Sequence, residues 1–78
     1  MENTGQLEKM KRTAEFLMNN NITAFVKDIY GNWYIGNIVL IGDIRITIDC
    51  IEGKRKGKRE YIIWSNVEYL DEKKGVEK

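Results

Sequence analysis

The fold is decided by residues 22–41, which read ITAFVKDIYGNWYIGNIVLI. Apolar and polar residues alternate along this stretch and β-branched and aromatic residues are frequent, a pattern typical of strands. At its centre, residues 30–32 predict a tight turn, because glycine and asparagine adopt positive φ at low cost. We therefore expect strands over residues 22–29 and 33–41, paired as an antiparallel hairpin. Gly36, inside the second strand, indicates a bend or a close approach of another backbone.

Three shorter strands are expected after this hairpin. The alternation over residues 44–51 predicts a half-buried strand with Cys50 as a small buried side chain on its inner face. Apolar and aromatic runs over residues 61–64 and 67–70 predict two more strands. Polar or glycine-containing breaks separate them, at residues 42–43, 53–58 and 65–66.

An amphipathic helix is expected before the strands, over about residues 5–19. Its apolar residues recur at intervals of three and four and share one stripe, formed by Leu7, Met10, Ala14 and Leu17. Asparagines 19–21 are predicted to end the helix, because asparagine tolerates the left-handed conformation of a C-terminal cap. The polar face mixes both signs of charge, which favours packing on the sheet over binding to a membrane.

One helix followed by five short strands predicts a mainly β fold, with a strongly bent antiparallel sheet. Closure of such a sheet into a small barrel would remove its exposed edges. A two-layer open sheet is the alternative. A chain of 78 residues is expected to form one domain, which we place over residues 1–70, followed by a frayed tail over residues 71–78.

Parts of this pattern resemble the Sm-like (Lsm/Hfq-type) family. Residues 22–28, 36–40 and Asp43 resemble its first motif, and residues 63–70 stand in the place of its second. The resemblance implies a five-stranded SH3-like barrel behind an N-terminal helix. It also implies a homo-oligomeric ring that binds single-stranded RNA, with Asp43 near a base edge.

Both motifs also depart from the family pattern. Ile46 and Thr47 stand where Sm proteins carry an asparagine for a uracil base, and residues 64–65 replace the Arg-Gly pair of the second motif. The resemblance therefore supports the fold and the ring better than it supports a uridine pocket.

The highest local charge lies in residues 53–60, GKRKGKRE, which hold five cations and one glutamate, a net charge of +4. At a hairpin tip these cations could hold RNA phosphates. The predicted phosphate contacts are Lys54, Arg55, Lys56, Lys58 and Arg59. The alternative is a solvated turn whose charge keeps neighbouring chains from stacking on the sheet.

Aromatic side chains could add stacking platforms for bases. The candidates are Tyr30, Trp33, Tyr34, Tyr61, Trp64 and Tyr69. Packing across strands is expected for most of them, and Trp33 and Trp64, which lie beside turns, are the two candidates for base contact. A turn-capping role is the alternative for Asp43, as it is for Asp28.

The composition argues against several other functions. Thirteen Lys and Arg face twelve Asp and Glu, a net charge of +1, which is low for a DNA-coating chromatin protein. One cysteine and no histidine leave no ligand set for a metal and no base beside a nucleophile, so we expect neither an enzyme nor a cofactor. The lone cysteine and the lack of a long apolar run predict a cytoplasmic protein with no membrane partner.

Two hypotheses follow from these observations. The leading one is an Sm-like RNA-binding protein that assembles as a homo-oligomeric ring and binds single-stranded RNA through the basic hairpin. The alternative is a protein-interaction or assembly module on an SH3-like barrel that does not bind nucleic acid. In that case Trp33, Trp64 and the apolar stripe of the helix would form a docking surface for a protein partner.

Overall fold

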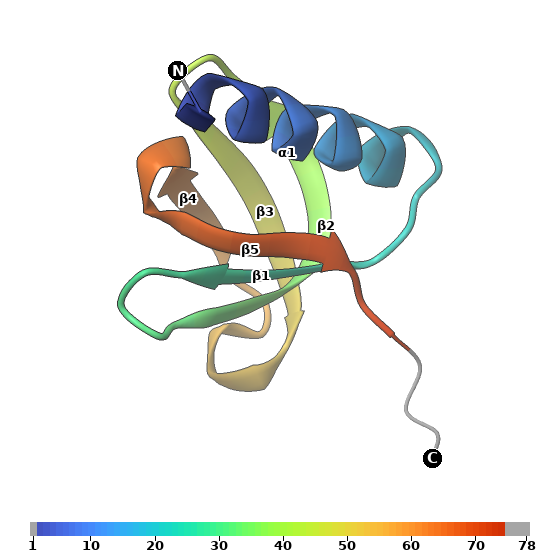
Figure 1. Cartoon of the computed structure of the whole chain (residues 1–78). Coiled ribbons are helices and arrows are strands. Elements are labelled where there is room, and N and C mark those ends of the chain that lie inside the picture. The colour runs from blue at the N-terminus through green and yellow to red at the C-terminus, as the bar shows by residue number, and fades with distance from the viewer. Residues whose placement is uncertain (1, 75–78) are drawn as a thin grey trace.

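The computed structural model describes residues 2–74 as one helix followed by five strands (Figure 1). The elements, in chain order, are α1 (Glu2–Asn19), β1 (Ala24–Asp28), β2 (Trp33–Ile41), β3 (Arg45–Glu52), the 3-10 turn η1 (Gly53–Arg55), β4 (Arg59–Ile63), the 3-10 turn η2 (Trp64–Asn66) and β5 (Val67–Glu72). All neighbouring strands are antiparallel. The predicted fold class, a helix before a bent five-stranded antiparallel sheet, is confirmed.

The sheet is open over the described residues, so the predicted closure into an SH3-like barrel is wrong. Its strand order is β4-β3-β2-β1-β5, so β4 and β5 are its two edges and do not pair with each other. They are consecutive in the chain and are joined only by η2. Each edge strand therefore presents one row of backbone N–H and C=O groups that the sheet itself leaves unpaired.

The strand ends differ from the predicted ones: β1 is shorter than the strand predicted over residues 22–29, and cross-strand pairing extends two other strands. β5 continues to Glu72, two residues into the predicted tail, because Phe25 and Ala24 of β1 pair with Asp71 and Glu72. β4 begins two residues early, at Arg59, which pairs with Asp49 of β3. The rest of the predicted tail includes residues 75–78, which lie outside the described residues.

The core lies between α1 and the inner face of the sheet. Alternation in the strands brings Val26, Ile38, Ile46, Ile48, Cys50 and Ile62 to that face, and all are buried. The stripe of the helix meets them, with Ala14 and Leu17 fully buried and Leu7 and Met10 partly so. Burial of an aliphatic side chain the size of Leu17 contributes about 1.5–3 kcal/mol. The helix ends at Asn19, among the asparagines predicted to end it, and Asn21 just beyond adopts a left-handed conformation with φ of 55°.

Gly36 marks a close approach between β2 and β3. A Cβ atom at this position would lie 1.9 Å from the backbone oxygen of Asp49. The pairing register between the two strands also shifts between Ile35 and Gly36. Only glycine fits here without movement of the β3 backbone, which confirms the close backbone approach predicted from the sequence.

Candidate nucleic-acid interface

The basic segment 53–60 is an ordered turn that connects β3 to β4. Gly53 and Gly57 have φ of 83° and 85°, values that side-chain-bearing residues rarely adopt. Backbone hydrogen bonds close the turn, from the N–H of Cys50 to Lys58 O at 2.9 Å and from the N–H of Gly57 to Cys50 O at 2.8 Å. The cations of this segment therefore stand on a defined backbone.

The five cations of the segment are not equivalent. Lys54, Lys56 and Lys58 are exposed, and none of them forms an ion pair within residues 2–74. Arg59 instead makes a bidentate contact with Asp49, Nε to Oδ1 at 2.6 Å and Nη2 to Oδ2 at 3.0 Å. This hydrogen bond from Arg59 lowers the pKa of the Asp49 carboxyl. Three of the five predicted phosphate contacts therefore carry a charge that no carboxylate of residues 2–74 pairs with.

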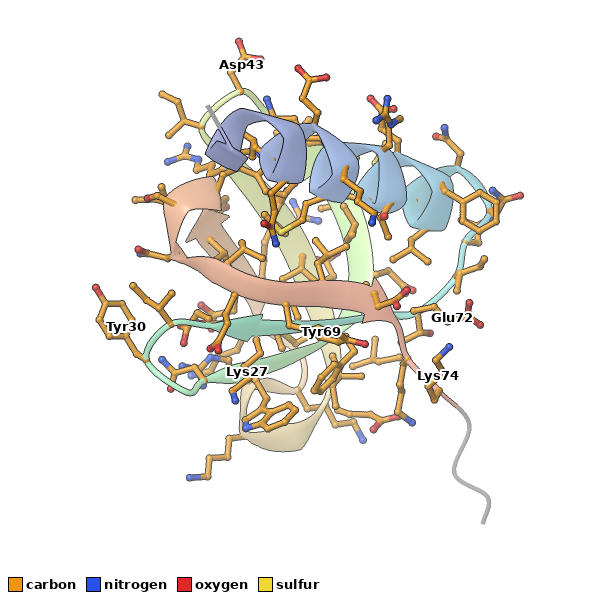
Figure 2. All side chains as sticks on the ribbon, in the orientation of Figure 1. Lys27, Tyr30, Asp43, Tyr69, Glu72 and Lys74 are labelled. Carbon is orange, nitrogen blue, oxygen red and sulfur yellow. The ribbon has the colours of Figure 1, made fainter. Side chains whose placement is uncertain are left out.

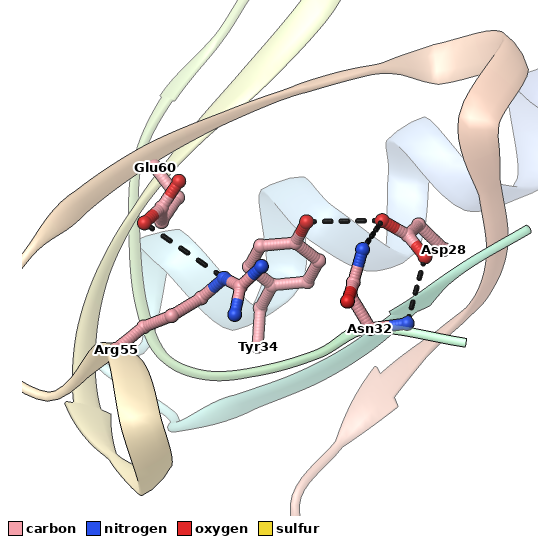
Figure 3. A network of polar contacts seen from close by, with 5 residues as sticks. All are labelled: Asp28, Asn32, Tyr34, Arg55 and Glu60. Atoms are coloured by element: carbon pink, nitrogen blue, oxygen red, sulfur yellow. Dashed lines mark hydrogen bonds and ion pairs between the residues drawn. The ribbon is translucent and has the colours of Figure 1, made fainter. Parts of the chain in front are cut away.

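Arg55 points into the end of the sheet rather than toward solvent (Figure 3). Its guanidinium carbon lies 4.8 Å from the centre of the Tyr34 ring. Its Nε atom is buried, 3.8 Å from Oε2 of Glu60, and makes no hydrogen bond among the described residues. Arg55 thus ties the basic turn to β2 and β4.

Asp28 organises the turn that precedes β2. Its buried carboxylate accepts hydrogen bonds from the backbone N–H groups of Tyr30 and Asn32, at 2.9 and 2.8 Å, and from the Asn32 amide and the Tyr34 hydroxyl, both at 3.0 Å (Figure 3). Burial alone raises the pKa of this carboxyl, but the hydrogen bonds together outweigh burial and hold its pKa below the ordinary value. The predicted turn-capping role of Asp28 is confirmed, and the turn fixes where β2 and its first residue, Trp33, begin.

Trp33 belongs to an aromatic cluster on the outer face of the sheet. It is 53% exposed, and its ring centre lies 4.6 Å from that of Phe25 on β1. The Phe25 ring in turn lies 5.8 Å from that of Tyr69 on β5, which is 45% exposed. Lys27 places its Nζ atom 5.3 Å from the centre of the Trp33 ring. The sequence pattern names Trp33 as a candidate for base contact and Tyr69 among the aromatics expected to pack across strands, but it names neither Phe25 nor Lys27.

Two hollows flank this cluster and share Ile35 in their walls. One, of about 220 Å³, connects Trp33 to the basic turn through Lys54 and Arg55. The other, of about 410 Å³, runs from Phe25 and Tyr69 to the end of β5; the remaining residues of its wall are Glu72, Lys73 and Lys74. The fold therefore brings Trp33, Lys54 and Arg55 together, as the interface hypothesis requires.

Asp43 and Trp64 lie away from this group. Trp64 is only 4% exposed, and its Nε1 atom donates a hydrogen bond to Gly42 O at 2.8 Å. Its ring packs in the core and is not open to a base. Asp43 is exposed in the turn between β2 and β3, beyond the opposite end of β2 from Trp33; Figure 2 shows it on the far side of α1 from Lys27 and Tyr69.

Other kinds of site find little support in the described part of the chain. Burial raises the pKa of the Cys50 thiol, which disfavours the thiolate that a nucleophile or a metal site needs. Within residues 2–74 no three metal-ligating side chains gather in one place. Over the same residues no helix is both long enough and apolar enough to cross a bilayer.

No protein-family model matches this chain, and no curated protein is a significant relative. The resemblance to Sm-like proteins therefore stays a hypothesis about residues 6–70.

Proposed function

We propose that this chain binds single-stranded RNA as a homo-oligomer and acts by binding rather than by catalysis, in the cytoplasm. The observation that carries the proposal is the group of exposed lysines, Lys54, Lys56 and Lys58, on a closed turn beside the exposed Trp33. Unpaired cations bind phosphates by releasing condensed counterions, and a neighbouring ring can stack on a base. The resemblance to Sm-like proteins supports the same function.

Self-association would multiply this local charge. Each chain carries a net charge of only +1, so one copy attracts a distant polyanion weakly. The two open sheet edges, β4 and β5, offer backbone groups for pairing between copies. Pairing of β4 from one copy with β5 of the next would also cover the exposed Ile63 and Ile44, which lie beside η2.

Salt dependence tests the phosphate contacts. Affinity for a 12-nucleotide oligo-U is measured across a salt series for the wild-type chain and for Lys54→Gln/Lys56→Gln. Loss of two phosphate contacts should lower the steepness of log K against log salt by about 1.4, at about 0.7 per contact for single strands. The matched control is Lys9→Gln/Arg12→Gln on α1, which changes the net charge by the same amount and should leave the slope unchanged.

Mass in solution tests the assembly. Light scattering at tens of micromolar should give a multiple of the 9.2 kDa chain mass. A strict monomer at this concentration would remove the homo-oligomer from the proposal.

The alternative, a protein-interaction module, is favoured by one observation. A hollow of about 580 Å³ lies between the start of α1 and η2, with a mostly apolar wall that includes Leu7, Met10, Ile44 and Ile63. Trp64 contributes little to such a docking surface, because its ring is buried. An interaction module would show no RNA binding at low salt, whereas the proposed function requires it.

A further inference from the structure

The aromatic cluster stands on three neighbouring strands because of their register. Lys27 on β1 is directly opposite Trp33 on β2 and Tyr69 on β5. Phe25 lies two residues earlier on the same face of β1, in the diagonal position to both rings. Large aromatic side chains in diagonal positions on neighbouring strands are close enough to be in contact. Three rings and one ammonium group thus form a continuous patch. Figure 2 shows two of its members, Lys27 and Tyr69, on the side of the sheet away from α1.

This patch contributes nothing to the core that α1 covers. Large aromatic side chains usually bury most of their surface, yet Trp33 and Tyr69 each leave about half of theirs in solvent. A group of exposed rings on a small domain marks a binding surface more often than it marks a stabilising one.

The charge around the patch is complementary to a polyanion. The two flanking hollows are lined by Lys54 and Arg55 on one side and by Lys73 and Lys74 on the other, against the two carboxylates Glu52 and Glu72. With Lys27, and with Asp71 directly opposite Phe25 on β5, the surface carries five cations and three anions, a net charge of +2. One cation, Lys73, is paired with Glu52 at 3.2 Å. The whole chain carries only +1, so this face is more positive than the rest of the molecule.

We propose that the outer face of β5, β1 and β2 is the base-binding surface of this protein, on which unpaired RNA bases stack against Trp33, Phe25 and Tyr69. This inference rests on the proposed function and assigns the bases to a surface distinct from the tip of the basic turn. Lys27 lies among the rings, so a phosphate next to a stacked base meets a cation there. Because every base has a π face, the surface accepts single strands of any sequence.

The test separates bases from phosphates. Binding of a 12-nucleotide oligo-A is compared with that of an abasic sugar-phosphate strand of equal length at one salt concentration. Stacking predicts that the abasic strand binds at least about ten-fold more weakly. It also predicts that oligo-A, but not the abasic strand, quenches the fluorescence of Trp33. The chain holds only two tryptophans, so subtraction of the Trp33→Phe spectrum isolates this signal from that of the buried Trp64.

Two tyrosines on the two edge strands provide the matched variants. Tyr69→Ala should weaken oligo-A binding about ten-fold, whereas Tyr61→Ala on β4, which is 58% exposed and lies outside the cluster, should leave it unchanged. Tyr69→Leu keeps an apolar contact with Phe25 but removes the ring, so it should lose affinity while folding like the wild-type chain.

Each outcome bears on the proposal. The stacking surface would be overturned if oligo-A and the abasic strand bound with equal affinity and if Tyr69→Ala and Tyr61→Ala had the same oligo-A affinity. The proposed function would still stand in that case if Lys54→Gln/Lys56→Gln weakened RNA binding. A change of mass in solution in Tyr69→Leu, with unchanged oligo-A affinity, would make the patch a contact between copies and also overturn it. Absence of all RNA binding at low salt would overturn both proposals.

Discussion

Two outward surfaces of the same sheet combine cations with aromatic rings, but they use the cations differently. On β3 and β4, Arg59 is bound to Asp49 and Arg45 lies over Tyr61, 5.3 Å from its ring centre. On β5, β1 and β2, Lys27 contacts Trp33 and forms no ion pair within the described residues. The first surface thus neutralises Arg59 and leaves Arg45 over a ring. The second neutralises Lys73, which pairs with Glu52 at 3.2 Å, and leaves Lys27 among the rings without a carboxylate partner in residues 2–74.

Register explains the difference. Asp49 and Arg59 are direct cross-strand partners, so opposite charges face each other across β3 and β4. Lys27 instead has an aromatic partner on either side, Trp33 and Tyr69. A count of charges along the sequence therefore overstates the available cations of the basic segment and misses the one that lies among the rings.

The largest expected effect comes from a change that breaks both surfaces at once. Gly36→Ala would press a Cβ atom against the backbone of Asp49, at 1.9 Å, and force β3 away from β2. Overpacking of this kind against backbone should cost about 3 kcal/mol in the free energy of unfolding. Urea denaturation followed by circular dichroism measures it.

Gly5→Ala in α1 is the control for the first prediction. Its Cβ would meet no atom within 4 Å, so the variant should gain up to about 1 kcal/mol from helix propensity. Equal stability of Gly36→Ala and the wild-type chain would show that the close approach at Gly36 imposes no constraint.

A smaller loss of stability is expected from a change in the turn that precedes β2 and positions Trp33. Asp28→Ala leaves the Tyr34 hydroxyl and the N–H groups of the turn without their acceptor, which should cost about 2–3 kcal/mol. Because the folded-state pKa of Asp28 lies below its ordinary value of 3.8, its contribution is present above that pH and is lost as pH falls further.

The pH dependence checks the origin of this effect. The stability gap between wild type and Asp28→Ala should be constant from pH 7 to about 5 and should narrow below about pH 4. A gap that stays constant through acid pH would mean that the carboxylate charge does not support the turn.

The sequence was sufficient for the fold wherever the evidence was local. The strand over residues 33–41 and the close approach at Gly36 follow from alternation and from one glycine. The aromatic surface was not predictable in the same way, because Phe25 and Tyr69 are brought together only by pairing between the first and last strands. Likewise, nothing in the sequence of residues 53–60 distinguishes Lys54 from Arg55, yet one is exposed and the other turns inward.

The third prediction concerns Arg55, which turns inward. It tests whether this arginine stabilises the fold rather than binding a phosphate. Arg55→Gln removes the contact with the Tyr34 ring and leaves the partly buried Glu60 without its ion pair, at a cost of about 1 kcal/mol. Arg59→Gln, on the β3–β4 surface, removes an exposed pair and should change the unfolding midpoint less. Denaturation of both variants at pH 7 makes the comparison. A larger loss from Arg59→Gln would reverse the roles assigned to the two arginines.

The smallest effect is expected from a variant that frees the paired cation on the β3–β4 surface. In Asp49→Asn the carboxylate that holds Arg59 is replaced by a neutral amide, so the guanidinium becomes free to contact a phosphate. If RNA follows the basic turn toward β4, the salt slope should steepen by up to about 0.7, the value for one added contact. If the strand runs instead from Lys54 across Trp33 toward β5, Arg59 is out of reach and the slope should not change. The variant thus distinguishes the two directions in which a single strand can leave the turn, and only the second is compatible with bases stacked on Phe25 and Tyr69.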